Sequence, residues 1–270
     1  MTIEFQPLTR HVGAEVKGLD LHEAYTPATA EALRRAFAAH KLLVVRQPAV
    51  SDDEQLRFAG IFGEVRIRYA RRNEDKQTLI QYVSNARPDG ILGDGEIVFH
   101  MDHTFYEVPL TAIILYGIEI PKTGTATKFR NANTLYLRLP PELRERARGV
   151  RVLHLFNYQG DHTAWQDPDA APPDSPRAWQ PLVWTNPETG EDSLWLSPLS
   201  TVDFEGISRA DGRKLIEDLR GYADSIDPEF TYVHRWAPGD LVLWDNRMLH
   251  HARLPFRSSE RRTLRRSSIL

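Results

Sequence analysis

The chain has 270 residues with a net charge of −3, and hydrophobic residues make up 41% of it while charged residues make up 26%. This is the composition of an ordinary globular protein, and the near-neutral charge gives no whole-chain footprint for nucleic acid. The sequence contains no cysteine, which excludes disulfides, thiolate metal sites, iron–sulfur clusters and a cysteine nucleophile. Any metal must therefore be bound by nitrogen and oxygen atoms.

Targeting signals are not evident in the sequence. No apolar run is long enough to cross a membrane, and the N-terminus lacks the apolar stretch of a signal peptide. We therefore expect a cytoplasmic protein with neither a membrane nor a nucleic acid as partner. The sequence is compatible with a homo-oligomer.

The N-terminal part of the chain is typical of an α/β scaffold and carries no evident chemistry. Residues 2–20 predict two short strands. Thr26 is the expected N-cap of a helix with Pro27 in its first turn, and the apolar run at 41–46 predicts a buried strand. The sequence SDDE at 51–54 is a capping-box signature and predicts a second helix.

An arginine-rich segment follows, RIRYARRNEDK at 66–76. A solvated loop is the simpler interpretation of this segment. The alternative is that Arg68 or Tyr69 reaches an anionic ligand. Residues 78–83 then predict a strand, and residues 86–95, with one proline and three glycines, predict a loop that leads to the next motif.

The stretch FHMDHTF at 99–105 carries the first candidate site. Residues two apart on an extended strand point to the same face, so His100 and Asp102 would present an imidazole and a carboxylate side by side. A surface pair on an edge strand is the alternative. The metal interpretation requires a third ligand and a reason for open coordination positions.

The rest of the chain is predicted to consist mainly of strands. They are expected at 111–120, 125–129, 150–156, 182–185, 193–196, 230–236, 241–244, 250–254 and 263–269. Helical patterns occupy residues 131–148, broken at Pro140, and a segment that Ser208 caps. Residues 158–180 are rich in proline, aspartate and alanine and have no period, which predicts an active-site lid or an insertion loop.

Many strands, tight turns and few long helices indicate a mainly β protein with flanking helices, of the α+β class, built on a closed β architecture. Neither an internal repeat nor a linker divides the sequence. We therefore expect a single domain over residues 1–270.

The sequence WDNRMLHHAR at 244–253 supplies the third ligand from a distant strand. Two histidines and one carboxylate form the facial triad that suits Fe(II) and leaves positions open for a co-substrate and O₂. Because neighbours on a strand face opposite sides, only one of His250 and His251 can reach the metal. Arg262 and Arg266 are four residues apart, so on a strand they share a face and can both point into a pocket.

Together these motifs resemble the taurine/2,4-dichlorophenoxyacetate dioxygenase (TauD/TfdA) family of Fe(II)- and 2-oxoglutarate-dependent oxygenases. The matching motifs are Phe62-Gly-Glu64, Ser84-Asn85, His100-x-Asp102, Thr127, Gly239–Arg247, His251 and Arg261-Arg262 through Arg266. The spacing also fits, with 24 residues between Asp102 and Thr127 and 10 between His251 and Arg262. Phe99 departs from the family's usual tryptophan.

The resemblance implies a double-stranded β-helix, a jelly-roll core like that of cupins, with Fe(II) and 2-oxoglutarate bound inside it. The expected site comprises the metal ligands and catalytic residues His100, Asp102 and His251, the 2-oxoglutarate contacts Thr127 and Arg262, and the substrate contacts Arg266, Arg68, Tyr69 and Asn85. Arg68 stands where the family often has a substrate-contacting histidine. An ion pair with Glu96 or Asp94 is the alternative role of Arg266.

The implied reaction is hydroxylation of a small, anionic organic substrate (a carboxylate, sulfonate or sulfate), coupled to decarboxylation of 2-oxoglutarate to succinate and CO₂, with O₂ as oxidant. Asp102 favours hydroxylation over halogenation, which would need that coordination position free for a halide. A zinc-dependent hydrolase could use the same three ligands but would not need a carboxylate anchor such as Arg262. A non-catalytic β-barrel binding protein would be expected to lack at least one ligand.

Overall fold

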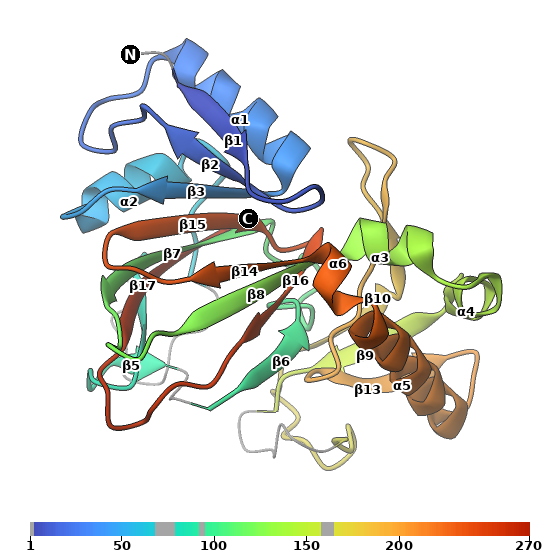
Figure 1. Cartoon of the computed structure of the whole chain (residues 1–270). Helices are drawn as coiled ribbons and strands as arrows, with labels where there is room; N and C mark the ends of the chain where they lie inside the picture. The colour runs from blue at the N-terminus through green and yellow to red at the C-terminus, as the bar shows by residue number, and fades with distance from the viewer. Residues whose placement is uncertain (1–2, 68–78, 92–94, 158–164) are drawn as a thin grey trace.

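Two stacked sheets form the centre of the computed structural model, which describes residues 3–67, 79–91, 95–157 and 165–270 (Figure 1). The larger sheet consists, in spatial order, of β1 (Glu4–Pro7), β2 (Ala14–Lys17), β3 (Leu42–Arg46), β15 (Asp240–Asp245), β7 (Ala112–Glu119), β17 (Thr263–Ile269), β4 (Gln81–Ser84) and β5 (Gly90–Ile91). The second consists of β14 (Thr231–Arg235), β8 (Ala126–Asn131), β16 (Leu249–Arg253) and β6 (Ile97–His100).

Helices and two smaller sheets surround this centre. The smaller sheets are β10 (Arg177–Pro181), β9 (Arg151–Leu155) and β13 (Thr201–Glu205), and the pair β11 (Val183–Thr185) and β12 (Asp192–Leu194). The helices are α1 (Pro27–His40), α2 (Asp52–Ala59), α3 (Ala132–Arg138), α4 (Pro141–Ala147), α5 (Arg209–Ser225) and α6 (Asp227–Phe230). Within the described ranges, none of the helices is both long and apolar enough to span a bilayer.

The N-terminal scaffold has the helix caps that the sequence predicts. The Thr26 side chain accepts a hydrogen bond from the backbone of Thr29, and Ser51 and Glu54 form a reciprocal capping box. Each cap satisfies backbone donors that the first turn of a helix leaves without partners. Helices α1 and α2 pack their apolar sides on one face of the large sheet, where they cover β3, β7 and β15 (Figure 1).

Strand β3 illustrates why the large sheet is buried on both faces. Leu43 and Val45 point toward the helices, whereas Leu42 and Val44 belong to the apolar cluster between the two sheets. A continuous apolar run is what a strand covered on both sides requires, since successive residues alternate between its faces. The second cluster includes Phe129 of β8 and Leu249 of β16, so it joins the two sheets.

Helices α3, α4 and α5 form a lateral lobe with β9 and β13. The predicted break at Pro140 is confirmed, because α3 ends before it and α4 begins directly after it. Strand β13 and helix α6 were not predicted from the sequence, and the strand expected at 78–83 is present as β4, which begins at Gln81.

The proposed lid at 158–180 lies only partly within the described residues. Residues 158–164 fall outside them, and the expectation that the segment is without regular structure is wrong at its end, where β10 pairs with β9. Trp165 packs against the lobe, with the guanidinium of Arg213 5.3 Å from its ring. This tryptophan therefore contacts the lobe and does not line the pocket between the two central sheets.

Candidate active site

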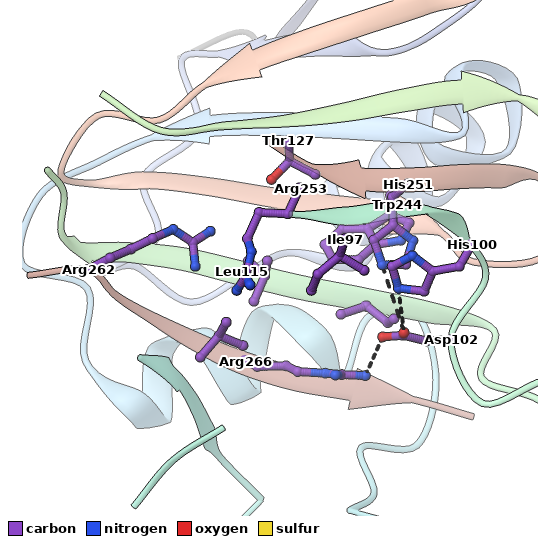
Figure 2. Close-up of a pocket in the computed structure, with 12 residues that line it drawn as sticks. Ile97, His100, Asp102, Leu115, Thr127, Trp244, His251, Arg253, Arg262 and Arg266 are labelled. Carbon is purple, nitrogen blue, oxygen red and sulfur yellow. Dashed lines mark ion pairs between the residues drawn. The ribbon is translucent and has the colours of Figure 1, made fainter. Parts of the chain in front are cut away.

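A pocket opens between the two central sheets, and both contribute to its walls (Figure 2). It is lined by Val83, Ile97, His100, Asp102, Ile113, Leu115, Thr127, Trp244, His251, Arg253, Arg262 and Arg266. The polar residues converge from several segments that are far apart in the sequence. The imidazole and carboxylate groups lie at one end of the pocket and the Arg262 guanidinium at the other (Figure 2).

His100, Asp102 and His251 come together as the sequence predicts. One donor atom from each lies within 4.8 Å of the others. Nε2 of His100 is 3.2 Å from Oδ1 of Asp102, and Nε2 of His251 is 3.8 Å from the same oxygen. Two imidazoles and one carboxylate suit a divalent transition metal such as iron or manganese.

The protonation states also fit a metal. Burial alone would raise the pKa of Asp102, but the adjacent Arg266 and the two histidines outweigh burial and hold that pKa well below its usual value. Burial, followed by the nearby His100 ring, lowers the pKa of His251 well below its usual value. Nδ1 of His100 lies 2.8 Å from the Val98 carbonyl, which favours the tautomer with a free lone pair on Nε2.

The way in which Asp102 reaches the site differs from the prediction. We expected His100 and Asp102 to share a face of one strand, but β6 ends at His100 and Asp102 lies in a turn. The amide of Asn246 holds this turn: its Oδ1 accepts from the Asp102 backbone N–H at 2.9 Å, and its Nδ2 donates to the Asp102 carbonyl at 2.8 Å. The carboxylate is thus placed by a side-chain clamp from the loop after β15, and not by strand alternation.

The two adjacent histidines of β16 face opposite sides, as expected for a strand. His251 joins the metal cluster, and it is paired in register with His100 of β6. His250 points away, and its Nε2 is 2.7 Å from the carbonyl of Leu194. His250 therefore fixes β16 to the neighbouring β12, and it is not part of the triad.

Arg262 is buried, with 2% exposure, and forms no ion pair with any carboxylate among the described residues. Burial, followed by Arg253 beside it, lowers the pKa of Arg262 to about 9, so the guanidinium is still charged at neutral pH. Its Nε has no hydrogen-bond partner within the same part of the chain. Burying an unpaired guanidinium lowers the stability of the folded protein. An anion bound in the pocket in front of Arg262 would offset this cost.

Thr127 and Arg253 face each other across the β8–β16 pair, and both line the pocket. Arg253 Nε donates to the Gly95 carbonyl at 2.9 Å. Sequence reasoning assigned no role to Arg253. Arg253 lies beside Arg262, so two guanidinium groups meet at this end of the pocket.

Arg266 lies in the pocket but has a partner that was not expected. Its Nη2 is 2.8 Å from Oδ2 of Asp102, and its Nε donates to Ser268 at 3.2 Å. Asp94 lies outside the described residues, and Glu96 forms no described ion pair with Arg266. The inward orientation predicted from strand parity is therefore present, but the acidic partner is the candidate metal ligand itself.

Of the three remaining predicted substrate contacts, only Asn85 is described by the structure, and it does not line the pocket. Arg68 and Tyr69 lie outside the described residues. The Asn85 amide is engaged with backbone, since it accepts from Arg262 N–H at 2.9 Å and donates to the Glu260 carbonyl at 2.9 Å. Asn85 thus holds the start of β17 in place, and its amide is not available to a substrate.

Comparison with protein-family models gives one match over almost the entire chain. Residues 4–268 match the model described as "Taurine catabolism dioxygenase TauD, TfdA family". All the residues that line the pocket fall within the matched range.

Curated proteins and solved structures agree with this match. The chain is 28% identical to the alpha-ketoglutarate-dependent 2,4-dichlorophenoxyacetate dioxygenase of Cupriavidus pinatubonensis, over 100% of this chain and 98% of that protein. It is 29% identical to the alpha-ketoglutarate-dependent sulfate ester dioxygenase of Pseudomonas putida, over 100% of this chain and 90% of that protein. The crystal structure of AAD-2 in complex with Mn(II) and N-oxalylglycine superposes with a TM-score of 0.83 at 29% identity, covering 100% of this chain and 97% of that one.

Proposed function

The chain belongs to the TauD/TfdA family of alpha-ketoglutarate-dependent dioxygenases, and on that basis we propose that it hydroxylates a small organic anion with Fe(II) as its metal. It is an oxidoreductase that consumes 2-oxoglutarate, the compound also called alpha-ketoglutarate. The observation that carries the proposal is the buried, unpaired Arg262 at the opposite end of the pocket from the His-Asp-His cluster. A zinc hydrolase would have no use for this carboxylate anchor, and a non-catalytic binding protein would be expected to lack at least one of the three ligands.

The two facing sheets are taken as the two halves of a double-stranded β-helix, and the whole chain as one catalytic domain. Both sheets supply pocket residues, and an apolar cluster joins them, which supports this interpretation. A site enclosed by two sheets is rigid, which suits an enzyme that must hold several ligands in one relative position.

His100, Asp102 and His251 would hold the iron. Two imidazoles and an ionised carboxylate match the donor set that suits Fe(II), and three protein ligands leave coordination positions open. The chemistry that bound iron supplies is oxidative, with 2-oxoglutarate, O₂ and a C–H bond giving succinate, CO₂ and a hydroxylated substrate. The protein binds and orients the two organic ligands.

Thr127 and Arg262 would bind the far carboxylate of 2-oxoglutarate, while its keto-acid end faces the triad. A guanidinium recognises a carboxylate with two parallel hydrogen bonds, and a threonine hydroxyl can add a third. Ile113 and Leu115 form apolar walls beside these groups. Apolar walls strengthen the attraction between the Arg262 guanidinium and the carboxylate of 2-oxoglutarate, and they keep water away from the reacting C–H bond.

Arg266 would bind the anionic group of the substrate. Arg262 and Arg266 both line the pocket, and the one far carboxylate of 2-oxoglutarate would be bound by Arg262. Nη2 of Arg266 faces Asp102 and its Nε donates to Ser268, so its Nη1 would bind the second anion. The relatives named for 2,4-dichlorophenoxyacetate and for sulfate esters act on anions, which supports this choice.

The first test is succinate formation from 2-oxoglutarate with the Fe(II)-loaded enzyme and a panel of small sulfonates, sulfate esters and aryloxyalkanoates, each matched to a neutral analogue. We expect stimulation by one class of anion and not by its neutral analogue, and no succinate without O₂. Equal stimulation by neutral analogues contradicts an anionic substrate. Turnover that is independent of O₂ contradicts the reaction class.

Two single variants then separate the roles of the arginines. We expect Arg262→Ala to weaken 2-oxoglutarate binding by about 100-fold, because a charged bidentate pair is lost. Arg266→Ala should weaken binding of the substrate identified by the panel by a similar factor, and it should leave the affinity for 2-oxoglutarate within about twofold of the wild-type value. The Arg266→Ala change should not weaken Mn(II) binding, because the cationic Arg266 side chain competes with a metal ion for the Asp102 carboxylate. A drop in melting temperature with unchanged substrate affinity would assign Arg266 a structural role.

A further inference from the structure

The hydroxyl of Thr127 has a buried hydrogen-bond partner that the function above does not use. The indole Nε1 of Trp236 lies 3.0 Å from Thr127 Oγ1, and both residues are buried, with 5% and 4% exposure. Within the part of the chain that the structure describes, this is the one hydrogen bond of the Thr127 side chain. Trp236 itself does not line the pocket.

The direction of this hydrogen bond follows from the chemistry of the two groups. An indole N–H can only donate, whereas a hydroxyl has one donor proton and two acceptor lone pairs. Trp236 must therefore donate and Thr127 must accept. The threonine proton then has to point elsewhere, and the open direction is the pocket that Thr127 shares with Arg262.

The indole is held firmly enough to impose this direction. The Trp236 backbone N–H donates to the Thr125 carbonyl at 3.1 Å, which fixes the end of β14 to β8. The indole ring packs edge-on against the buried His234 ring, with centroids 4.6 Å apart and planes at 82°. Since His234 pairs in register with Thr127, the tryptophan reaches the threonine from beyond the end of the strand.

We propose that Trp236 is a positioning residue for co-substrate binding: its indole N–H occupies the acceptor side of the Thr127 hydroxyl and directs the hydroxyl proton to the far carboxylate of 2-oxoglutarate. This inference rests on the proposed binding of that carboxylate by Thr127 and Arg262. The consequence is pre-organisation. A free hydroxyl rotates and can donate to other acceptors, whereas this one is already oriented as a donor when the anion arrives.

The test uses two metal-chelating probes, of which only one carries the far carboxylate that Thr127 is proposed to bind. N-oxalylglycine carries a far carboxylate beside its metal-chelating oxalyl group, whereas oxalate offers the chelating end alone. Binding of each to the Mn(II)-loaded protein is measured by calorimetry. We expect Trp236→Phe to lower the affinity for N-oxalylglycine by about three- to tenfold and to leave the affinity for oxalate unchanged. The reason is that the variant weakens one neutral hydrogen bond, and only the far carboxylate of N-oxalylglycine makes it.

A double-mutant cycle with Thr127→Val decides whether the tryptophan acts through the threonine. Thr127→Val alone should lower the affinity for N-oxalylglycine by about tenfold or more. Adding the Trp236→Phe change to the Thr127→Val variant should have no further effect. Independent, multiplying effects would overturn the inference, as would an unchanged affinity in Trp236→Phe. If Thr127→Val leaves the affinity unchanged while Arg262→Ala abolishes binding, the role of Thr127 fails but the proposed function stands.

Trp195→Phe is the matched control. Its buried indole also donates one hydrogen bond, to the Arg247 carbonyl at 3.1 Å, but neither Trp195 nor Arg247 lines the pocket. The control should lower the melting temperature without changing the affinity for N-oxalylglycine. Loss of affinity in the control comparable to that in Trp236→Phe would mean that general destabilisation explains both.

A second measurement keeps the inference testable if Trp236→Phe does not fold. In protein labelled with ¹⁵N-tryptophan and loaded with Zn(II), six indole N–H signals are expected. One of them should shift in Thr127→Val, which assigns it to Trp236. That signal should move when N-oxalylglycine binds and stay in place with oxalate, because a hydroxyl that donates to an anion is a stronger acceptor. An identical response to both probes would overturn the inference.

Discussion

The two adjacent histidines of β16 provide the sharpest contrast at the scale of single residues. His251 faces the cluster with His100 and Asp102, whereas His250 is bound to the Leu194 carbonyl and is fully buried. Burial, with repulsion from Arg130, lowers the pKa of His250 to about 3, so it stays neutral across the physiological range. One histidine is thus available to a metal and the other is a structural contact.

Alanine at each position should therefore have opposite effects. We expect His251→Ala to lower Mn(II) affinity by at least about 100-fold with little loss of stability. His250→Ala should keep Mn(II) affinity within about threefold and lower the free energy of unfolding by about 2–3 kcal/mol, because it removes a buried hydrogen bond and leaves a cavity. Calorimetric titration with Mn(II) and thermal unfolding measure the two quantities. The reverse pattern would move the metal to His250.

The role of Asn246 was not predicted from the sequence. Its contacts with the backbone of Asp102 join residues 144 positions apart, and no local pattern indicates them. Strand alternation predicted that His100 and Asp102 lie together, which is correct. The reason was wrong, because β6 ends at His100 and Asp102 lies beyond the strand. The residue types and their spacing identified the ligands, and tertiary contacts determine how they are held.

The clamp itself can be tested. Asn246→Ala removes two hydrogen bonds to Asp102 and one to the Leu110 carbonyl, and none of them involves a metal-binding atom. We expect Mn(II) affinity to fall by about 10- to 100-fold, as for other groups that orient metal ligands. Asn133→Ala is the control, because it removes one hydrogen bond to the Asp192 carbonyl outside the pocket. Equal Mn(II) affinity in the two variants would show that the clamp is dispensable.

Helices with explicit caps were predicted well at the scale of elements, and short strands were not. The cap signals at Thr26, Ser51 and Ser208 lie within a few residues of the helices they begin, so local sequence carries them. Strand β13 has no such signal. It exists because it pairs with β9, with an irregular register between Thr201 and Asp203. Strand formation of this kind depends on the partner more than on intrinsic preference.

Helix α5 offers a matched pair of glycines that tests its packing on β13. A methyl group at Gly212 would lie 2.2 Å from the Phe204 ring, whereas one at Gly221 would meet nothing within 4 Å. We expect Gly212→Ala to lower the free energy of unfolding by about 1–3 kcal/mol through overpacking. Gly221→Ala should raise it by about 0.5–1 kcal/mol, because alanine loses less backbone entropy in a helix. Thermal unfolding checks both, and stabilisation by both variants would contradict this packing.

The active site is assembled at the scale of the whole molecule from segments that span most of the sequence. Strand β15 pairs with both β3 and β7, and β17 pairs with β7 and β4, so the C-terminal strands are inserted between earlier ones. Hydrophobic alternation predicts that such strands exist but does not give their order in the sheet. The resemblance to a known family implied a β-helical core but named no strand order, so the order is known only from the structure.

The two ends of the pocket are proposed to bind different groups. The triad at one end would hold iron, and Arg262 with Thr127 at the other end would hold the far carboxylate of 2-oxoglutarate, so one ligand should bridge both ends. This bridging can be observed without knowing the substrate. It needs only the protein, Fe(II) and 2-oxoglutarate in the absence of O₂.

The most direct test is therefore an anaerobic visible absorption titration. We predict that Fe(II) and 2-oxoglutarate added together give a weak charge-transfer band that neither gives alone. The band should be absent in His251→Ala and should require about 100-fold more 2-oxoglutarate in Arg262→Ala. A wild-type protein that shows no band with both ligands, or that shows it with equal 2-oxoglutarate affinity in Arg262→Ala, would contradict the account.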